Sequence, residues 1–246
     1  MTPATSTDAT RRTARVVGVL FLVATAAGGL SVAVTEPVLG SGDLLAGVSA
    51  HKTQVLIGAL LVLVMGVAVV GLSVAAYPVL RRRGPGLALG YVASRTVEAM
   101  LYALGAISLI SLVMLSEQYV AAPAPDATSF GAMAEVLVSV REWGTAAVLD
   151  TAVFPVGALI LYSLLYRARL VPRWLSAWGL VGAVLYLAGG VVLALDLTGA
   201  SSAALVLSNV PLAVNELVLA VWLIAKGFSA PARAPQPRTD DALVPA

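Results

Sequence analysis

The chain has 246 residues, of which 59% are hydrophobic and only 11% are charged. A soluble domain carries about 25% charged residues, so this composition excludes an ordinary soluble protein. Cysteine is absent and His51 is the single histidine, which excludes disulfides, thiolate chemistry and multi-histidine metal sites. The net charge of +2 is too small to indicate a nucleic-acid partner, and the sequence predicts no metal site and no cofactor.

Long apolar blocks predict an all-α polytopic membrane bundle with six transmembrane helices. A bilayer core about 30 Å thick needs about 20 apolar helical residues to cross it. The segments that qualify are 16–35, 54–79, 87–115, 143–166, 174–195 and 204–226. We expect residues 15–228 to form the transmembrane domain, with disordered polar segments at 1–14 and 229–246.

Lysine and arginine are distributed unequally between the two ends of the predicted helices. One side holds Arg11, Arg12, Arg15, Arg81, Arg82, Arg83, Arg167, Arg169, Arg173, Lys226, Arg233 and Arg238. The other side holds Lys52 and Arg141. Because positive charge near helix ends stays cytoplasmic, both termini are expected in the cytoplasm, with three hairpins facing outward.

The first span has a second interpretation. Residues 11–27 combine a basic region, an apolar core and small residues, as a signal peptide does. Cleavage near Ala26 or Ala27 would leave five helices and an exterior N-terminus. The apolar run continues to Thr35, however, which favours a membrane span.

Two further patterns concern the predicted fourth span. Phe130, Met133 and Leu137 recur at helical spacing ahead of it, which predicts an amphipathic helix on the outer surface or an extension of the span. A plain connector is the alternative. Tyr162 and Tyr166 lie at its inner end and are expected to be interfacial anchors.

Four charged residues lie inside the predicted spans: Arg95, Glu98, Asp150 and Glu216. Each costs about 2.5–3.5 kcal/mol at a helix centre, and such residues usually face the bundle interior and find partners. At 1.5 Å per residue, their depths from the inner surface are about 12, 16, 18 and 15 Å. All four are therefore expected near the membrane midplane.

The residues around Arg95 form one stripe of a helix. Tyr91, Arg95, Glu98 and Tyr102 follow the i, i+4, i+7, i+11 pattern. Glu216 lies on the last span beside Asn215, and we expect the two polar faces to meet.

Charge balance suggests what this cluster does. One arginine faces three carboxylates, so we expect that at least one of Glu98, Asp150 and Glu216 is protonated or that a cation binds. The leading hypothesis is a membrane protein that binds or carries a small molecule, ion or proton at this polar cluster. In the alternative, a structural or assembly protein, the buried charges only specify helix packing. An enzyme is favoured less, because no G-x-S-x-G, H-E-x-x-H or phosphate-loop motif is present, and no catalytic residue is assigned.

Three sequence blocks carry a family resemblance: "LALGYVASRTVEA", "LYRARLVPRWLSAWGLVGA" and "PLAVNELVLAVWLIAKGF". They resemble a bacterial integral-membrane family of unknown function, the domain-of-unknown-function 4386 family. The resemblance covers residues 11–228. It implies a six-helix protein of the bacterial cytoplasmic (inner) membrane, and it implies no activity, substrate or catalytic residue.

Overall fold

The computed structural model describes residues 3–122, 127–195 and 203–229, apart from the side chains of residues 3–8, 127, 144–147, 150–151, 193–194 and 203–206. Within these ranges the regular structure is helical. The elements are α1 (Pro3–Leu39), α2 (Leu44–Ala50), α3 (Lys52–Leu80), α4 (Pro85–Ala121), α5 (Ala127–Ser139), η1 (Val140–Ala147), η2 (Leu149–Val153), α6 (Phe154–Ala168), α7 (Arg173–Ala194) and α8 (Ala203–Ala225).

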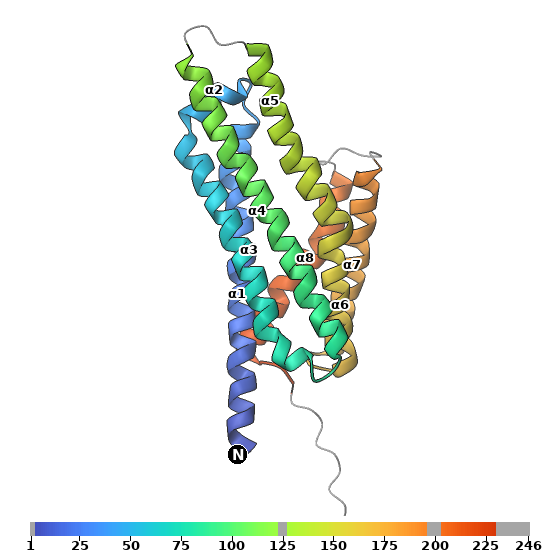
Figure 1. Ribbon diagram of the computed structural model, residues 1–246. Coiled ribbons are helices and arrows are strands. Elements are labelled where there is room, and N and C mark those ends of the chain that lie inside the picture. The colour runs from blue at the N-terminus through green and yellow to red at the C-terminus, as the bar shows by residue number, and fades with distance from the viewer. Residues whose placement is uncertain (1–2, 123–126, 196–202, 230–246) are drawn as a thin grey trace, which may run out of the picture.

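The helices form two groups that α8 joins (Figure 1). In the first group, α3 packs between α1 and α4, and α2 and α5 cover the end farther from the start of α1. In the second, α6 and α7 pack together, and α4 contacts α6. Helix α8 packs along α7 and crosses to contact α1. This crossing brings α8 to the interior side of α4, where the polar stripe lies.

The outer surface of the bundle is apolar enough for lipid. Among the described residues, the helices long and apolar enough to span a membrane are Ala9–Leu39, Lys52–Leu80, Pro85–Ala121, Arg173–Val192 and Leu207–Ala225. Large aliphatic side chains are exposed along them, such as Val67 at 75% and Met100 at 65%. Exposed apolar surface of this extent marks contact with a membrane, so the predicted membrane bundle is confirmed.

The fourth predicted span, 143–166, differs from the expected single α-helix. Its α-helical part, α6, has only 15 residues, fewer than the roughly 20 that a bilayer core requires. The preceding segments η1 and η2 are π-helical. Pro155 offers a physical reason, because proline lacks the backbone N–H that would continue the regular ladder toward η2. The described part of the chain therefore has five spans by length and composition, with this segment as a shorter apolar helix.

The segment ahead of η1 is a helix, as its pattern predicts. Helix α5 runs directly into η1 and packs along α4, where Ser108 Oγ donates a 2.5 Å hydrogen bond to the Leu137 carbonyl. Tyr119 and Phe130 add an edge-on ring contact with centroids 5.6 Å apart. The helix thus extends the fourth hydrophobic segment, and the alternative of a plain connector is wrong.

The structure bears differently on the two terminal segments, 1–14 and 229–246, that the composition predicts to be disordered. Helix α1 begins at Pro3, so helical backbone covers most of segment 1–14, which the composition predicts to be disordered. Residues 230–246 of the predicted disordered tail lie outside the described residues.

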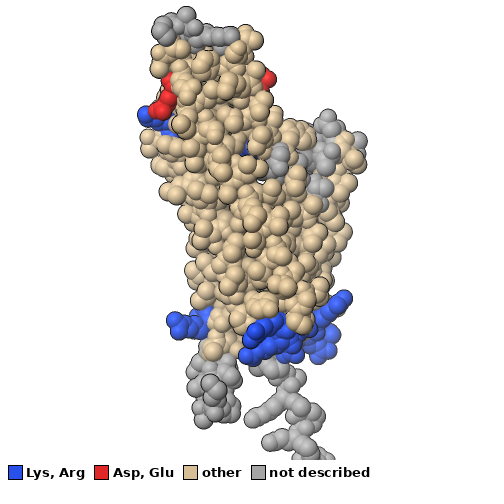
Figure 2. All heavy atoms as spheres, viewed as in Figure 1, with Lys and Arg blue, Asp and Glu red and all other residues tan. Residues whose placement is uncertain are grey.

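Charge separates the two ends of the bundle (Figure 2). Exposed cations gather at the end where α1 begins; they are Arg11, Arg12, Arg15, Arg81, Arg82, Arg83, Arg167, Arg169, Arg173 and Lys226. We call this the basic end. At the opposite end Lys52 pairs with Glu117 at 2.7 Å, and Arg141 pairs with Glu36 at 3.0 Å. The two cations at that end are therefore balanced by carboxylates.

Candidate functional site

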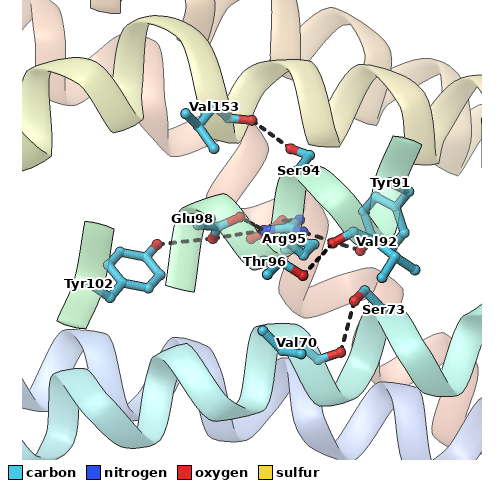
Figure 3. Close-up of polar contacts among 11 residues, drawn as sticks. Val70, Ser73, Tyr91, Val92, Ser94, Arg95, Thr96, Glu98, Tyr102 and Val153 are labelled. Atoms are coloured by element: carbon cyan, nitrogen blue, oxygen red, sulfur yellow. Dashed lines mark hydrogen bonds and ion pairs between the residues drawn. The ribbon is translucent and has the colours of Figure 1, made fainter. Parts of the chain in front are cut away.

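Arg95 is a fully buried arginine on α4 whose Nε and Nη1 atoms both have side-chain partners on the same helix. The residue is 1% exposed and Glu98 is 0% exposed. Arg95 Nη1 donates to both carboxylate oxygens of Glu98, at 2.9 and 2.8 Å, and Nε donates to the Tyr91 hydroxyl at 3.3 Å. The Tyr102 hydroxyl donates to Glu98 Oε1 at 3.1 Å. Figure 3 shows these contacts running along α4, so the predicted stripe is one connected network.

Two aromatic rings, one on α4 and one on α6, and a glycine of α6 surround the guanidinium and its neighbour Ser94. The guanidinium carbon lies 5.3 Å from the Tyr91 ring centroid and 5.2 Å from that of Phe154 on α6, within the range of cation–π attraction. A Cβ atom on Gly157 of α6 would come within 2.6 Å of Ser94 Oγ. Ser94 in turn donates to the Val153 carbonyl at 2.9 Å, which joins α4 to η2. A close α4–α6 approach therefore encloses Arg95.

Glu216 brings a second carboxylate to the same arginine from α8. Its Oε1 lies 3.6 Å from Arg95 Nη2, close enough for an ion pair. Neither of these two atoms has a hydrogen-bond partner among the described residues. The predicted meeting of the polar faces of the third and last spans is confirmed. We call Tyr91, Arg95, Glu98, Tyr102 and Glu216 the Arg95 cluster.

The charges in this cluster do not balance when all are ionised. One guanidinium stands against two carboxylates, which leaves one negative charge in surroundings that are nearly closed to solvent. Burial of an uncompensated charge is costly, so such sites take up a proton or a counter-ion. The Glu98 carboxylate is satisfied by Arg95 and Tyr102, whereas Glu216 Oε1 is not. Glu216 is therefore the carboxylate of the cluster that has an oxygen without a hydrogen bond.

Two predicted site residues do not join this cluster in the described structure. Asn215 is 0% exposed, but its Nδ2 donates to the Leu175 carbonyl at 3.0 Å, so it ties α8 to α7. The backbone of Asp150 belongs to η2, and its side chain lies outside the described part. Among the residues described, no three His, Cys, Asp or Glu side chains come together as a metal site.

Tyr162 is the main residue that sequence reasoning placed wrongly. It was expected at the membrane interface, yet it is 0% exposed. Its ring packs directly on Gly179 of α7, where any Cβ atom would overlap it. Tyr162 also interacts electrostatically with Glu216 and Arg95. The signal that could have located it is the glycine at 179, because a small residue on one helix admits a large one from its neighbour.

Comparison with known proteins places the chain in a family. A family profile described as "Domain of unknown function (DUF4386)" matches residues 16–227, which include the whole Arg95 cluster. The chain belongs to the DUF4386 family. The resemblance carried by the three sequence blocks is thereby confirmed. Comparison with curated proteins and with solved structures gives no match. Membership of DUF4386 supplies no activity, so any function has to be argued from the geometry.

Proposed function

We propose that this protein is a multi-pass membrane protein that binds and releases a proton or small cation at the Arg95 cluster. The observation that carries the proposal is the position of Glu216 Oε1, buried 3.6 Å from Arg95 Nη2 without a hydrogen bond. A carboxylate held in this way gains a partner when it takes up a proton or a cation. A small ligand is favoured because Arg95 and Glu98 are 1% and 0% exposed and the Glu216 side chain is only 13% exposed.

The alternative function, in which the buried charges only fix helix packing, is supported less well. All the hydrogen bonds of the Arg95–Glu98 pair and its two tyrosines stay within α4. Bonds within one helix do not set the register between helices. The ion pair that Arg95 makes with another helix is the one with Glu216, and at 3.6 Å it is longer than a hydrogen bond. A packing device would be expected to place its shortest bonds between helices.

The orientation we propose has six crossings with both termini in the cytoplasm. Helical backbone runs without a break from α5 through η1, η2 and α6, and this supports a sixth crossing that includes π-helical turns. The exposed cations at the basic end support a cytoplasmic location for that end under the positive-inside rule. The membrane is then the cytoplasmic membrane of a bacterium, as the family resemblance implies.

Infrared spectroscopy of the purified protein in nanodiscs tests the binding site. A pH step should produce the carbonyl band of a buried carboxyl group, and Glu216→Gln should abolish it because the amide cannot take up the proton. Glu117→Gln is the matched control, since Glu117 is 48% exposed in an ion pair at the end of the bundle. If the ligand is instead a metal cation, a monovalent salt should raise the melting temperature of the wild type and leave that of Glu216→Gln unchanged.

Two results would reject the site. One is a wild-type protein with neither a titrating buried carboxyl group nor a salt response. The other is a response that persists fully in Glu216→Gln. Either outcome would favour the alternative in which the cluster has only a structural role.

A further inference from the structure

A second set of buried polar atoms lies beside the Arg95 cluster and lacks partners. Among the described residues, Tyr162 Oη, Ser176 Oγ, Asn215 Oδ1 and Trp222 Nε1 are buried without any hydrogen bond. Tyr162, Ser176 and Asn215 are each 0% exposed. Buried polar groups that the protein leaves unpaired are costly and are generally satisfied by bound water. Four such atoms on the neighbouring helices α6, α7 and α8 therefore need a common explanation.

The side chains of Tyr162, Ser176 and Asn215 converge on a single turn of α7, residues 175–179. The Tyr162 ring packs on Gly179, and Asn215 Nδ2 donates to the Leu175 carbonyl at 3.0 Å. Ser176 lies one residue beyond Leu175 and one helical turn before Gly179, so it belongs to the same face of α7. The turn thus receives polar side chains from α6 and α8 and contributes one of its own.

Three of these residues lie between the basic end and the depth of Glu216, and Asn215 lies one residue farther from the basic end along α8 than Glu216. Counted along their helices at 1.5 Å per residue, Ser176 lies about 5 Å from Arg173, and Trp222 lies about 6 Å from Lys226. Tyr162 lies about 9 Å from Ala168, and Glu216 about 15 Å from Lys226. Tyr162 interacts electrostatically with Glu216, and Asn215 is the residue directly before Glu216 on α8.

The other half of the bundle offers no comparable set among the described residues. Buried hydroxyls elsewhere are satisfied by backbone carbonyls: Ser73 Oγ donates to Val70 at 2.8 Å, and Ser116 Oγ donates to Val113 at 2.7 Å. Tyr102, on the side of the cluster away from the basic end, donates to Glu98. In the part of the chain that the structure describes, unpaired buried polar side-chain atoms therefore occur only on Arg95 and on four residues of α6, α7 and α8 besides Glu216.

We infer that Tyr162, Ser176, Asn215 and Trp222 line a narrow hydrated path by which protons reach Glu216 from the basic end. The path deepens the proposed function and rests on it, because it supplies one side of access to the same carboxylate. A proton entering at the basic end is passed along hydrogen-bonded waters and hydroxyls. Each oxygen accepts one proton and gives up another, and the last proton forms an O–H bond at Glu216 Oε1. Release runs through the same bonds in reverse, so no other reactant is consumed.

Radiolytic hydroxyl-radical labelling of the full chain in lipid nanodiscs tests the path, because water bound at a buried site labels the side chains it touches. We expect the Tyr162 ring to be labelled on the order of tenfold more than Phe21, with each normalised to the unfolded protein. Phe21 is the matched control, since it is 4% exposed and packs in the apolar core. Labelling of Tyr162 no greater than that of Phe21 would overturn the inference.

A substitution at Ser176, in the turn of α7, provides a second test by the same labelling. Ser176→Val removes the hydroxyl and fills its space, so labelling of Tyr162 should fall to the level of Phe21. Ser73→Val should leave Tyr162 labelling unchanged, because Ser73 bonds to its own helix on α3. Unchanged Tyr162 labelling in a folded Ser176→Val variant would contradict a path through this turn. If that variant does not fold, the comparison of Tyr162 with Phe21 in the wild-type protein tests the path. If Tyr162 is labelled but the infrared spectra show no titration of Glu216, the proposed function is rejected. If Glu216 titrates but Tyr162 is not labelled, the path is rejected and the proposed function stands.

Discussion

At the scale of single residues, the central feature is a salt bridge enclosed within one helix. Arg95 and Glu98 have side chains that are 2% and 1% exposed, and one guanidinium nitrogen serves both carboxylate oxygens. A buried pair of this kind contributes little net stability relative to apolar residues of similar size, but removing one partner leaves the other as an uncompensated buried charge. The pair is therefore expected to behave as a unit under mutation.

A double-mutant cycle checks this unit. Arg95→Met should lower the free energy of unfolding by about 3–5 kcal/mol because it strands the Glu98 charge, and Arg95→Met combined with Glu98→Leu should recover most of the loss. Lys52→Gln is the control, because the Lys52–Glu117 pair has side chains 54% and 48% exposed and should be worth about 1 kcal/mol or less. Circular dichroism of unfolding in mixed micelles measures all of these changes. Equal losses for Arg95→Met and Lys52→Gln would contradict the interpretation.

At the scale of helices, close contacts at glycines determine which side chains face one another. Gly179 on α7 accepts the Tyr162 ring, and a Cβ atom on Gly182 would lie 3.1 Å from the backbone of Leu212 on α8. In a membrane there is no water to drive helices together, so close packing through small residues takes a larger share. These contacts bring α6, α7 and α8 together around the turn at 175–179.

Substitution of the glycines tests this role. Gly179→Ala should cost about 1–3 kcal/mol of stability, because the added methyl group overlaps the ring of a fully buried tyrosine. Gly29→Ala should be neutral or stabilising by up to about 1 kcal/mol, because this glycine lies within α1 and no atom lies within 4 Å of the place its new methyl group would take. Thermal melts of the two variants in the same detergent provide the comparison. A Gly179→Ala protein as stable as Gly29→Ala would show that the α6–α7 contact is loose.

At the scale of the whole molecule, the two ends of the bundle differ in charge and in how far the two groups of helices extend. Helix α4, with 37 residues, is about 55 Å long, whereas α8, with 23 residues, is about 34 Å long. The first group of helices therefore extends past α7 and α8 at the end away from the cations (Figure 1). The exposed cations at the basic end and the paired charges at the other support the proposed orientation, which the positive-inside rule predicts.

The absence of cysteine makes the orientation simple to test. Gly42, between α1 and α2, and Gly86, at the start of α4, both have open space where a side chain would be added. With a membrane-impermeant thiol reagent, Gly42→Cys should be labelled in intact cells, and Gly86→Cys should be labelled only after the membrane is permeabilised. The reverse pattern would place the basic end outside the cytoplasm.

The sequence by itself determined the features that depend on one helix at a time. The apolar runs predict membrane helices, and the spacing of Tyr91, Arg95, Glu98 and Tyr102 puts them on one stripe because the helical period is fixed by the backbone. The contact between Glu216 and that stripe was expected only because buried charges need partners. Local pattern could not foresee the π-helical turns before Pro155, because a span is recognised by its length and apolar content, which do not report the local hydrogen-bond period.

Only the tertiary structure decided which helix faces meet. It directs Asn215 to the Leu175 carbonyl and Glu216 to Arg95, although the two residues are adjacent in sequence and both polar. It also moves Tyr162 from the expected interface into the core against Gly179. The rotation of each helix about its axis depends on small residues on other helices, far away in the sequence, and no single segment contains that information.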